Sequence, residues 1–133
     1  MLFRSEEGAT GAEEIGEVVE SLRPDRIGHG ILAAGDPDLM ALIRQAAVTL
    51  EICPSSNLLT KALADEDAVR ETLHRFVEHD VPFTIATDGP EMMRTHLRDE
   101  FELLHRIGAL DDDGLARANA RGHAAAFVGR EER

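Results

Sequence analysis

Short apolar runs alternate along the chain with longer amphipathic segments. The apolar residues from Val69 to Val77 recur at i, i+4, i+7 and i+8, which predicts a helix that begins at Asp65 and stops before Val81. Other segments with acidic starts or a periodic apolar face predict further helices over 11–22, from 36 to about 47, around 97–104 and over 111–128. Compact apolar runs predict strands at 2–3, around 27, from 48 to Pro54 and at 83–87.

These strands are separated by about the ~30 residues of a strand-helix-strand unit. Each strand runs apolar on both faces, which predicts burial from both sides and therefore a parallel sheet. The predicted fold class is α/β, with parallel strands alternating with helices. Polar residues follow every strand, at 6–7, 29, 55–57 and 88. Because parallel strands end at one edge of their sheet, we expect these side chains to gather there.

Asp88 stands out, since it ends the apolar stretch of "PFTIATDGP" and is followed at once by Gly89 and Pro90. A carboxylate at the end of a buried strand is how parallel α/β proteins place catalytic groups. Aspartate also caps turns and helices, so the stretch by itself leaves both roles open.

The length, net charge and cysteine count of the chain exclude several classes of function. The chain of 133 residues is long enough for one domain with a real core, and its 26 acidic against 14 basic residues give a formal net charge of −12. That charge argues against nucleic acid and favours a small-molecule or protein partner. One cysteine, Cys53, excludes an intrachain disulfide and a cysteine cluster for zinc. The opening residues have no apolar stretch of signal-peptide length and no run could span a bilayer, so we expect a cytoplasmic protein without membrane contact.

Three motifs, taken together, resemble those of a known family. They are "RIGHG" at 26–30, "CPSSNLLT" at 53–60 and "ATDGP" at 86–90, followed by a similar tail over 97–127. In this order and at this spacing they resemble the metal-dependent adenosine deaminases, which are TIM (β/α)8 barrels. The resemblance covers strands five to eight of that barrel, so residues 1–133 are expected to form a single partial domain, its C-terminal half.

The resemblance implies a chemistry and gives residues roles in it. In such enzymes a divalent metal, usually zinc, activates water for attack on C6 of an aminopurine nucleoside or base, and ammonia leaves. Glu7 matches the glutamate that protonates the ring. His29 matches the histidine that handles the water, and Asp88 matches the metal-binding carboxylate.

The sequence also departs from the family pattern. The family's His-x-His pair belongs to the first strand, which this sequence does not include. Arg4 stands where another histidine ligand is expected, and a guanidinium cannot coordinate a cation. Gly89 replaces an aspartate that meets the N7 side of the purine. With Asp88 as the one matched ligand where about three are needed, we expect no complete metal site and no activity from this chain alone. Surface or core roles are expected for the remaining histidines, at 74, 79, 96, 105 and 123.

Three hypotheses follow. The chain is the C-terminal half of an adenosine deaminase-like hydrolase whose other ligands lie upstream, with its sequence beginning where a truncated gene or mis-called start would begin. Alternatively, two copies associate through their open sheet edges into a barrel that binds a purine. The third hypothesis is a doubly wound, non-catalytic domain that binds a purine or a protein partner, or has no role beyond folding.

Overall fold

The computed structural model describes residues 2–5, 11–87 and 96–126 of the chain. Four parallel strands, β1 (Leu2–Ser5), β2 (Arg26–His29), β3 (Thr49–Ile52) and β4 (Phe83–Ile85), form one sheet. The helices of the described part are α1 (Gly11–Leu22), the 3-10 helix η1 (Ile31–Gly35), α2 (Pro37–Gln45), α3 (Pro54–Leu59), α4 (Glu66–Glu78), α6 (Leu97–Arg106) and α7 (Asp112–Ala125).

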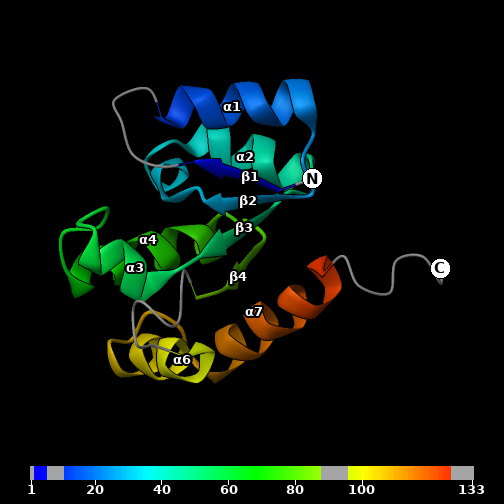
Figure 1. Cartoon of the computed structure of the whole chain (residues 1–133). Coiled ribbons are helices and arrows are strands. Elements are labelled where there is room, and N and C mark those ends of the chain that lie inside the picture. Colours follow the sequence, from blue (N-terminus) through cyan, green and yellow to red (C-terminus); the bar gives the residue numbers. More distant parts are fainter. Residues whose placement is uncertain (1, 6–10, 88–95, 127–133) are drawn as a thin grey trace.

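The strands lie in the sheet in the order in which they occur in the chain, β1-β2-β3-β4. Figure 1 shows the same progression, from α1 beside β1 to α6 and α7 beside β4. A doubly wound sheet reverses its strand order at a switch point, whereas a (β/α)8 barrel adds each strand on the same side. The doubly wound hypothesis is therefore wrong, and the predicted α/β class with a barrel-type order is confirmed.

Local sequence explains where several helices begin. Asp36 accepts a hydrogen bond from the Leu39 amide at 3.1 Å, with Pro37 at the first helical position, as predicted. Asp65 caps α4 in the same way, and Asp111 caps α7, with acceptor distances of 2.9 and 2.7 Å. Each cap satisfies an amide that the helix itself leaves without a partner.

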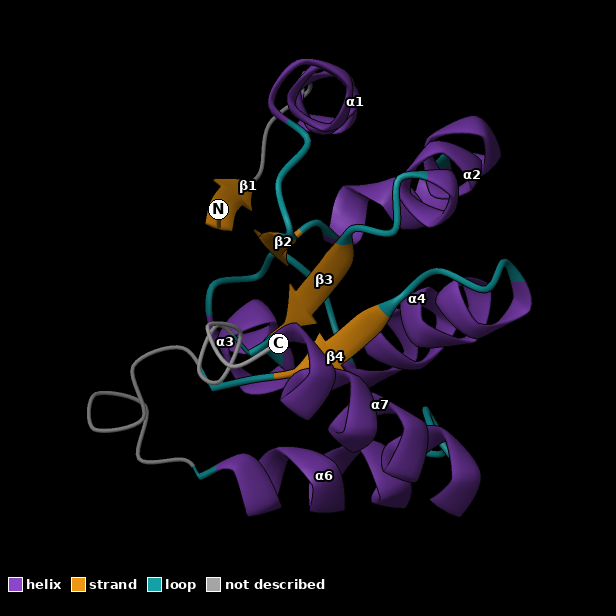
Figure 2. Ribbon diagram, turned by 90° about the vertical axis from the view of Figure 1, so that its right-hand side faces the viewer, coloured by secondary structure: helices purple, strands orange, loops and turns teal. Residues whose placement is uncertain are grey.

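The core lies between the strands and the helices α1, α2 and α4, which Figure 2 shows along one side of the strands. Ile27, Leu50 and Ile52 are buried in this layer, together with Phe76 of α4. Burial of such side chains contributes roughly 1.5–3 kcal/mol each, so this layer is a large source of stability for the half-barrel.

The prediction that every strand is buried on both faces is wrong for β2 and β3. Arg26, Thr49 and Glu51 lie on the face opposite the core, and all three are half-buried. The charged residues within "RIGH" and "TLEI" are the physical reason, because a charge is seldom buried without a partner. Among β2, β3 and β4, whose burial the structure describes, only β4 is buried at every residue.

Two helical segments and several boundaries differ from the predictions. Residues 31–35 and 54–59 are helical, although the sequence pattern predicted no helix there. The strands end earlier than predicted, at Ile52 and Ile85, and α2 ends at Gln45 rather than near 47. Both extra helices have six or fewer residues, which is too short for an apolar period to be recognised.

Candidate active site

The carboxyl end of β2 has an unusual backbone. His29 is the last residue of the strand and has a φ of 63°, in the left-handed region, and Gly30 follows with a φ of 72°. The other non-glycine residues with positive φ in the described ranges follow the ends of helices, where this conformation is a common termination. A histidine held this way at a strand end is strained, and such strain gathers at functional sites.

His29 is buried and faces Asn57. Its Nδ1 lies 3.1 Å from Oδ1 of Asn57, and the two side chains are 7% and 1% exposed. Asn57 belongs to α3, which begins with Pro54 directly after β3. The predicted meeting of polar residues from successive strand ends is therefore confirmed for "RIGHG" and "CPSSN", which lie 28 positions apart.

α3 is held in turn by α6. The backbone amide of Ser55 donates a hydrogen bond of 3.0 Å to Oε2 of Glu100, which is 1% exposed. Charge-assisted bonds of this kind are among the stronger ones in proteins. The contact attaches the segment that carries Asn57 to a helix from the far end of the chain.

The half-buried face of the sheet carries a second polar contact. Arg26 Nη1 lies 2.7 Å from Oε1 of Glu51, and the two side chains are 19% and 17% exposed. On β4, Thr84 shares a register position with Glu51 and donates a hydrogen bond of 2.9 Å to the carbonyl oxygen of Ala118 in α7. On this face, Arg26 and Glu51 are therefore paired with each other, and Thr84 is bonded to α7.

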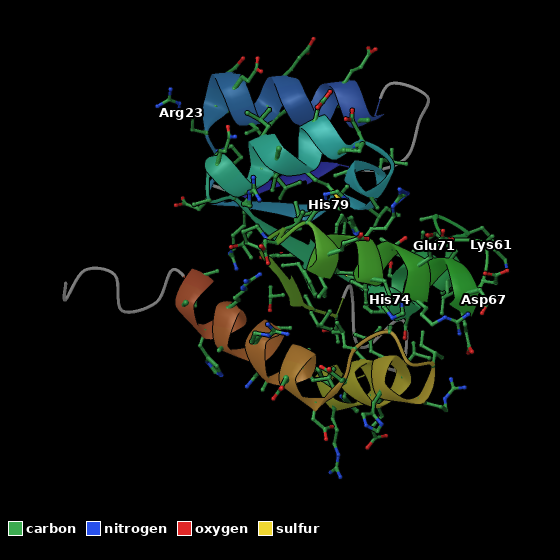
Figure 3. The ribbon with its side chains drawn as sticks, turned by 180° about the vertical axis from the view of Figure 1, so that it is seen from behind. Arg23, Lys61, Asp67, Glu71, His74 and His79 are labelled. Carbon is green, nitrogen blue, oxygen red and sulfur yellow. The ribbon has the colours of Figure 1, made fainter. Side chains whose placement is uncertain are left out.

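The other histidines lie in helices or at their caps, as predicted. His74 is on α4, where Figure 3 shows it near α6, and its Nε2 lies 2.9 Å from the carbonyl oxygen of Gly108. His79 and His96 are cap residues of α4 and α6, and His105 and His123 lie in the last turns of α6 and α7. Among the residues that the structure describes, no three His, Cys, Asp or Glu side chains are grouped so as to hold a metal ion.

The predicted site residues divide into two groups. His29 lies at the edge where it was expected, and Arg4 lies in β1 in register with Gly28. Glu7, Asp88 and Gly89 lie outside the described residues. The described residues therefore do not by themselves fit a catalytic metal.

The sequence of this chain matches the model of a known protein family. The model of the family described as "Adenosine deaminase" matches residues 6–133. The chain belongs to the adenosine deaminase family. This agrees with the resemblance of the three motifs, and it makes the His29 edge part of a deaminase-type barrel.

Curated relatives are similar over most of the chain. An aminodeoxyfutalosine deaminase of Acidothermus cellulolyticus is 42% identical over 102 residues, which is 77% of this chain and 28% of the relative. An adenosine deaminase of Pectobacterium atrosepticum is 30% identical over 125 residues, which is 94% of this chain and 36% of the relative. The chain thus spans about a third of the length of these relatives.

Solved structures agree on the fold. An adenine deaminase from Arthrobacter aurescens superimposes with a TM-score of 0.84 at 23% identity, over 98% of this chain and 39% of that one. An N6-methyl-AMP deaminase from Arabidopsis thaliana gives a TM-score of 0.73 at 22% identity, over 90% of this chain and 34% of that one. No helix in the described ranges is long and apolar enough to cross a membrane.

Sequence reasoning assigned no role to two residues of this region. Asn57 was quoted in a motif, and its place after a strand was the available signal. Glu100 lies between Leu97 and Leu104 on the predicted apolar face of α6, at i+3 from Leu97 and i−4 from Leu104. An acid at that position is the signal of a buried, paired carboxylate.

Proposed function

We propose that this chain carries the C-terminal half of the active site of a hydrolase that deaminates adenosine or a related 6-aminopurine. The observation that supports this most directly is the buried, strained His29 at the carboxyl end of β2, in contact with Asn57 of the next strand-helix unit. In parallel barrels this is the edge at which catalytic groups lie.

In the proposed reaction a water molecule attacks C6 of the purine, and its proton passes to His29, the general base. Glu7 donates a proton to the ring nitrogen. His29 then returns its proton to the exocyclic amine, the C6–N6 bond breaks and ammonia leaves, while the proton of the new C6 hydroxyl passes to Glu7 as the 6-oxo purine forms. A positioned base of this type contributes typically 10²–10⁴-fold to the rate.

Asp88 is proposed as a ligand of a divalent metal, zinc or a related ion. The further ligands would come from residues that this chain does not include. A bound divalent metal would make water nucleophilic near neutral pH. The chain by itself is therefore expected to bind no stoichiometric metal and to be inactive.

The substrate class is inferred from the relatives. By their names they act on aminodeoxyfutalosine, adenosine and adenine, which share a 6-aminopurine. The identity of 42% to an aminodeoxyfutalosine deaminase makes that nucleoside the first substrate to test. Gly89, which stands where the family has an aspartate, is proposed as a substrate-facing position.

A chimera tests the proposal. Residues 1–133 would replace the corresponding segment of the Acidothermus cellulolyticus deaminase, and ammonia release would be measured with aminodeoxyfutalosine, adenosine and adenine. We expect activity that falls by at least 10²-fold with His29→Ala or Asp88→Ala. A folded chimera without activity, or full activity in both variants, would contradict the proposed function. The separate 133-residue chain, loaded with zinc, is the control for the expected inactivity.

A second candidate is a homodimer in which two half-barrels close into one barrel that binds a purine. It is favoured by the sheet order, in which β1 and β4 each pair with a single described strand and leave an edge for another chain. Light scattering at micromolar concentration decides between the two. A dimer would support this candidate, and a monomer would remove it.

A further inference from the structure

Asn57 is a costly residue to bury in this fold. Its side chain is 1% exposed, and its Nδ2 has no hydrogen-bond partner among the described residues. A buried polar atom without a partner costs roughly 1–3 kcal/mol. The contact that the Asn57 side chain does make is the one between Oδ1 and Nδ1 of His29. An apolar side chain would pack there at lower cost, so the asparagine requires an explanation other than stability.

The contact has a consequence for the imidazole. A carbonyl oxygen can only accept a hydrogen bond, so Nδ1 of His29 must carry the hydrogen at the 3.1 Å contact. In the neutral ring the lone pair is then on Nε2. The opposite orientation of the amide would direct Nδ2 at Nδ1, and the ring hydrogen would lie on Nε2. Only the first arrangement gives Nε2 the ability to take a proton.

The backbone of Asn57 is well held. Its amide donates to the carbonyl oxygen of Cys53 at 2.9 Å, and its own carbonyl oxygen accepts from the Leu63 amide at 3.0 Å. The bond between Ser55 and Glu100 fixes the same turn from α6. An acceptor on such a support loses little freedom when it orients a ring.

We propose that Asn57 is a positioning residue that holds neutral His29 in the Nδ1–H tautomer, so that Nε2 can accept the proton of the attacking water. The catalytic part of this inference rests on the proposed function, whereas the tautomer itself does not. Asn57 acts through His29 and need not touch the substrate.

Nitrogen NMR of the 133-residue chain tests the tautomer without any assay of activity. The imidazoles are labelled with ¹⁵N, spectra are recorded about two pH units above the ordinary histidine pKa of ~6.5, and the His29 signals are those absent from His29→Gln. We expect the hydrogen on Nδ1 in the native chain and in Asn57→Asp, and a mixture of tautomers in Asn57→Ala. The matched control is Asn119→Ala, which changes the other asparagine of the chain, an exposed one, and should leave His29 unaltered.

The hydrogen on Nε2 in the native chain, or an unchanged tautomer in Asn57→Ala, would overturn the inference. If Asn57→Ala does not fold, Asn57→Leu replaces it, because leucine fills a similar volume without an acceptor. In the chimera, Asn57→Ala is expected to lower kcat on the order of 10²-fold with little change in KM, and Asn57→Asp to recover part of the loss. An inactive chimera with the expected tautomer would refute the proposed function alone. An active chimera with the wrong tautomer would refute only this inference.

Discussion

The amide nitrogen of Ser55 lies 3.0 Å from Oε2 of Glu100, a contact across 45 positions of the sequence. Through it, α6 fixes the first turn of α3, and α3 places Asn57 against His29. A residue of the last third of the chain thus supports the edge at which β2 and β3 end. The candidate site therefore depends on packing between helices as well as on the sheet.

Glu100→Ala should destabilise the fold through this contact. The change removes the acceptor of the partly buried Ser55 amide, so we expect the free energy of unfolding to fall by about 1–3 kcal/mol. Glu100→Gln keeps a carbonyl acceptor and should cost less. Urea denaturation measures the difference. Glu102→Ala is the matched control, since Glu102 is an exposed acid on the same helix whose pair with Arg98 should contribute below ~1 kcal/mol. Equal losses for Ala at 100 and at 102 would contradict the prediction.

Substitutions of His29 should reveal how much its left-handed backbone conformation lowers the free energy of unfolding. At a φ of 63°, glycine is favoured over any residue with a Cβ. We therefore expect His29→Gly to be more stable than His29→Ala by about 1 kcal/mol, since both variants lose the same imidazole contacts. The same pair of changes at His105, within α6, should give the opposite order, because glycine is the poorer helix former. Thermal or urea unfolding of the four variants shows whether glycine or alanine is the more stable residue at each of the two positions.

Particular residues show which parts of the fold and of the candidate site the sequence could predict. The apolar period from Val69 to Val77 and the cap at Asp36 are local signals, and they predicted α4 and α2 well. The prediction of buried strand faces failed at Arg26 and Glu51, whose charged side chains are 19% and 17% exposed and pair across β2 and β3. Asn57 and Glu100 derive their roles from partners 28 and 45 positions away. Such contacts exist only after the helices have packed, so a local pattern could not predict them.

Gly30→Ala should be strongly unfavourable for two reasons. The residue has a φ of 72°, and a Cβ built on it would lie 2.9 Å from Cδ2 of the buried Leu50. We expect a loss of about 1–3 kcal/mol in the free energy of unfolding, measured by urea denaturation. Gly35→Ala is the control, since a Cβ there meets nothing within 4 Å. A loss at Gly30 no larger than that at Gly35 would show that the strand end can relax.

Gly89→Asp tests the proposed substrate-facing position in the chimera. If the missing carboxylate is the reason for weaker recognition of adenosine, the variant should lower KM for adenosine by about 10-fold or more with little change in kcat. An aspartate carboxylate can accept a hydrogen bond from the exocyclic amine beside N7, which glycine cannot, and a direct bond to a charged group contributes about 1.5–3 kcal/mol. Steady-state kinetics with adenosine and aminodeoxyfutalosine measure it. Unchanged KM values for both would indicate that Gly89 does not face the purine.

The contact between α7 and β4 offers a test by a double-mutant cycle. A Cβ on Gly122 would lie 2.7 Å from Oγ1 of Thr84, the same oxygen that donates to the carbonyl of Ala118. At an exposed position inside a helix, Gly→Ala raises the free energy of unfolding by about 1 kcal/mol. A decrease at Gly122 would therefore measure the close approach of α7 and β4. We expect Gly122→Ala to destabilise the native chain and to become neutral or stabilising when Thr84→Ala is also present. The coupling, on the order of 1 kcal/mol, is obtained from urea denaturation of the four proteins. Additive effects would mean that α7 shifts to make room without disturbing Thr84.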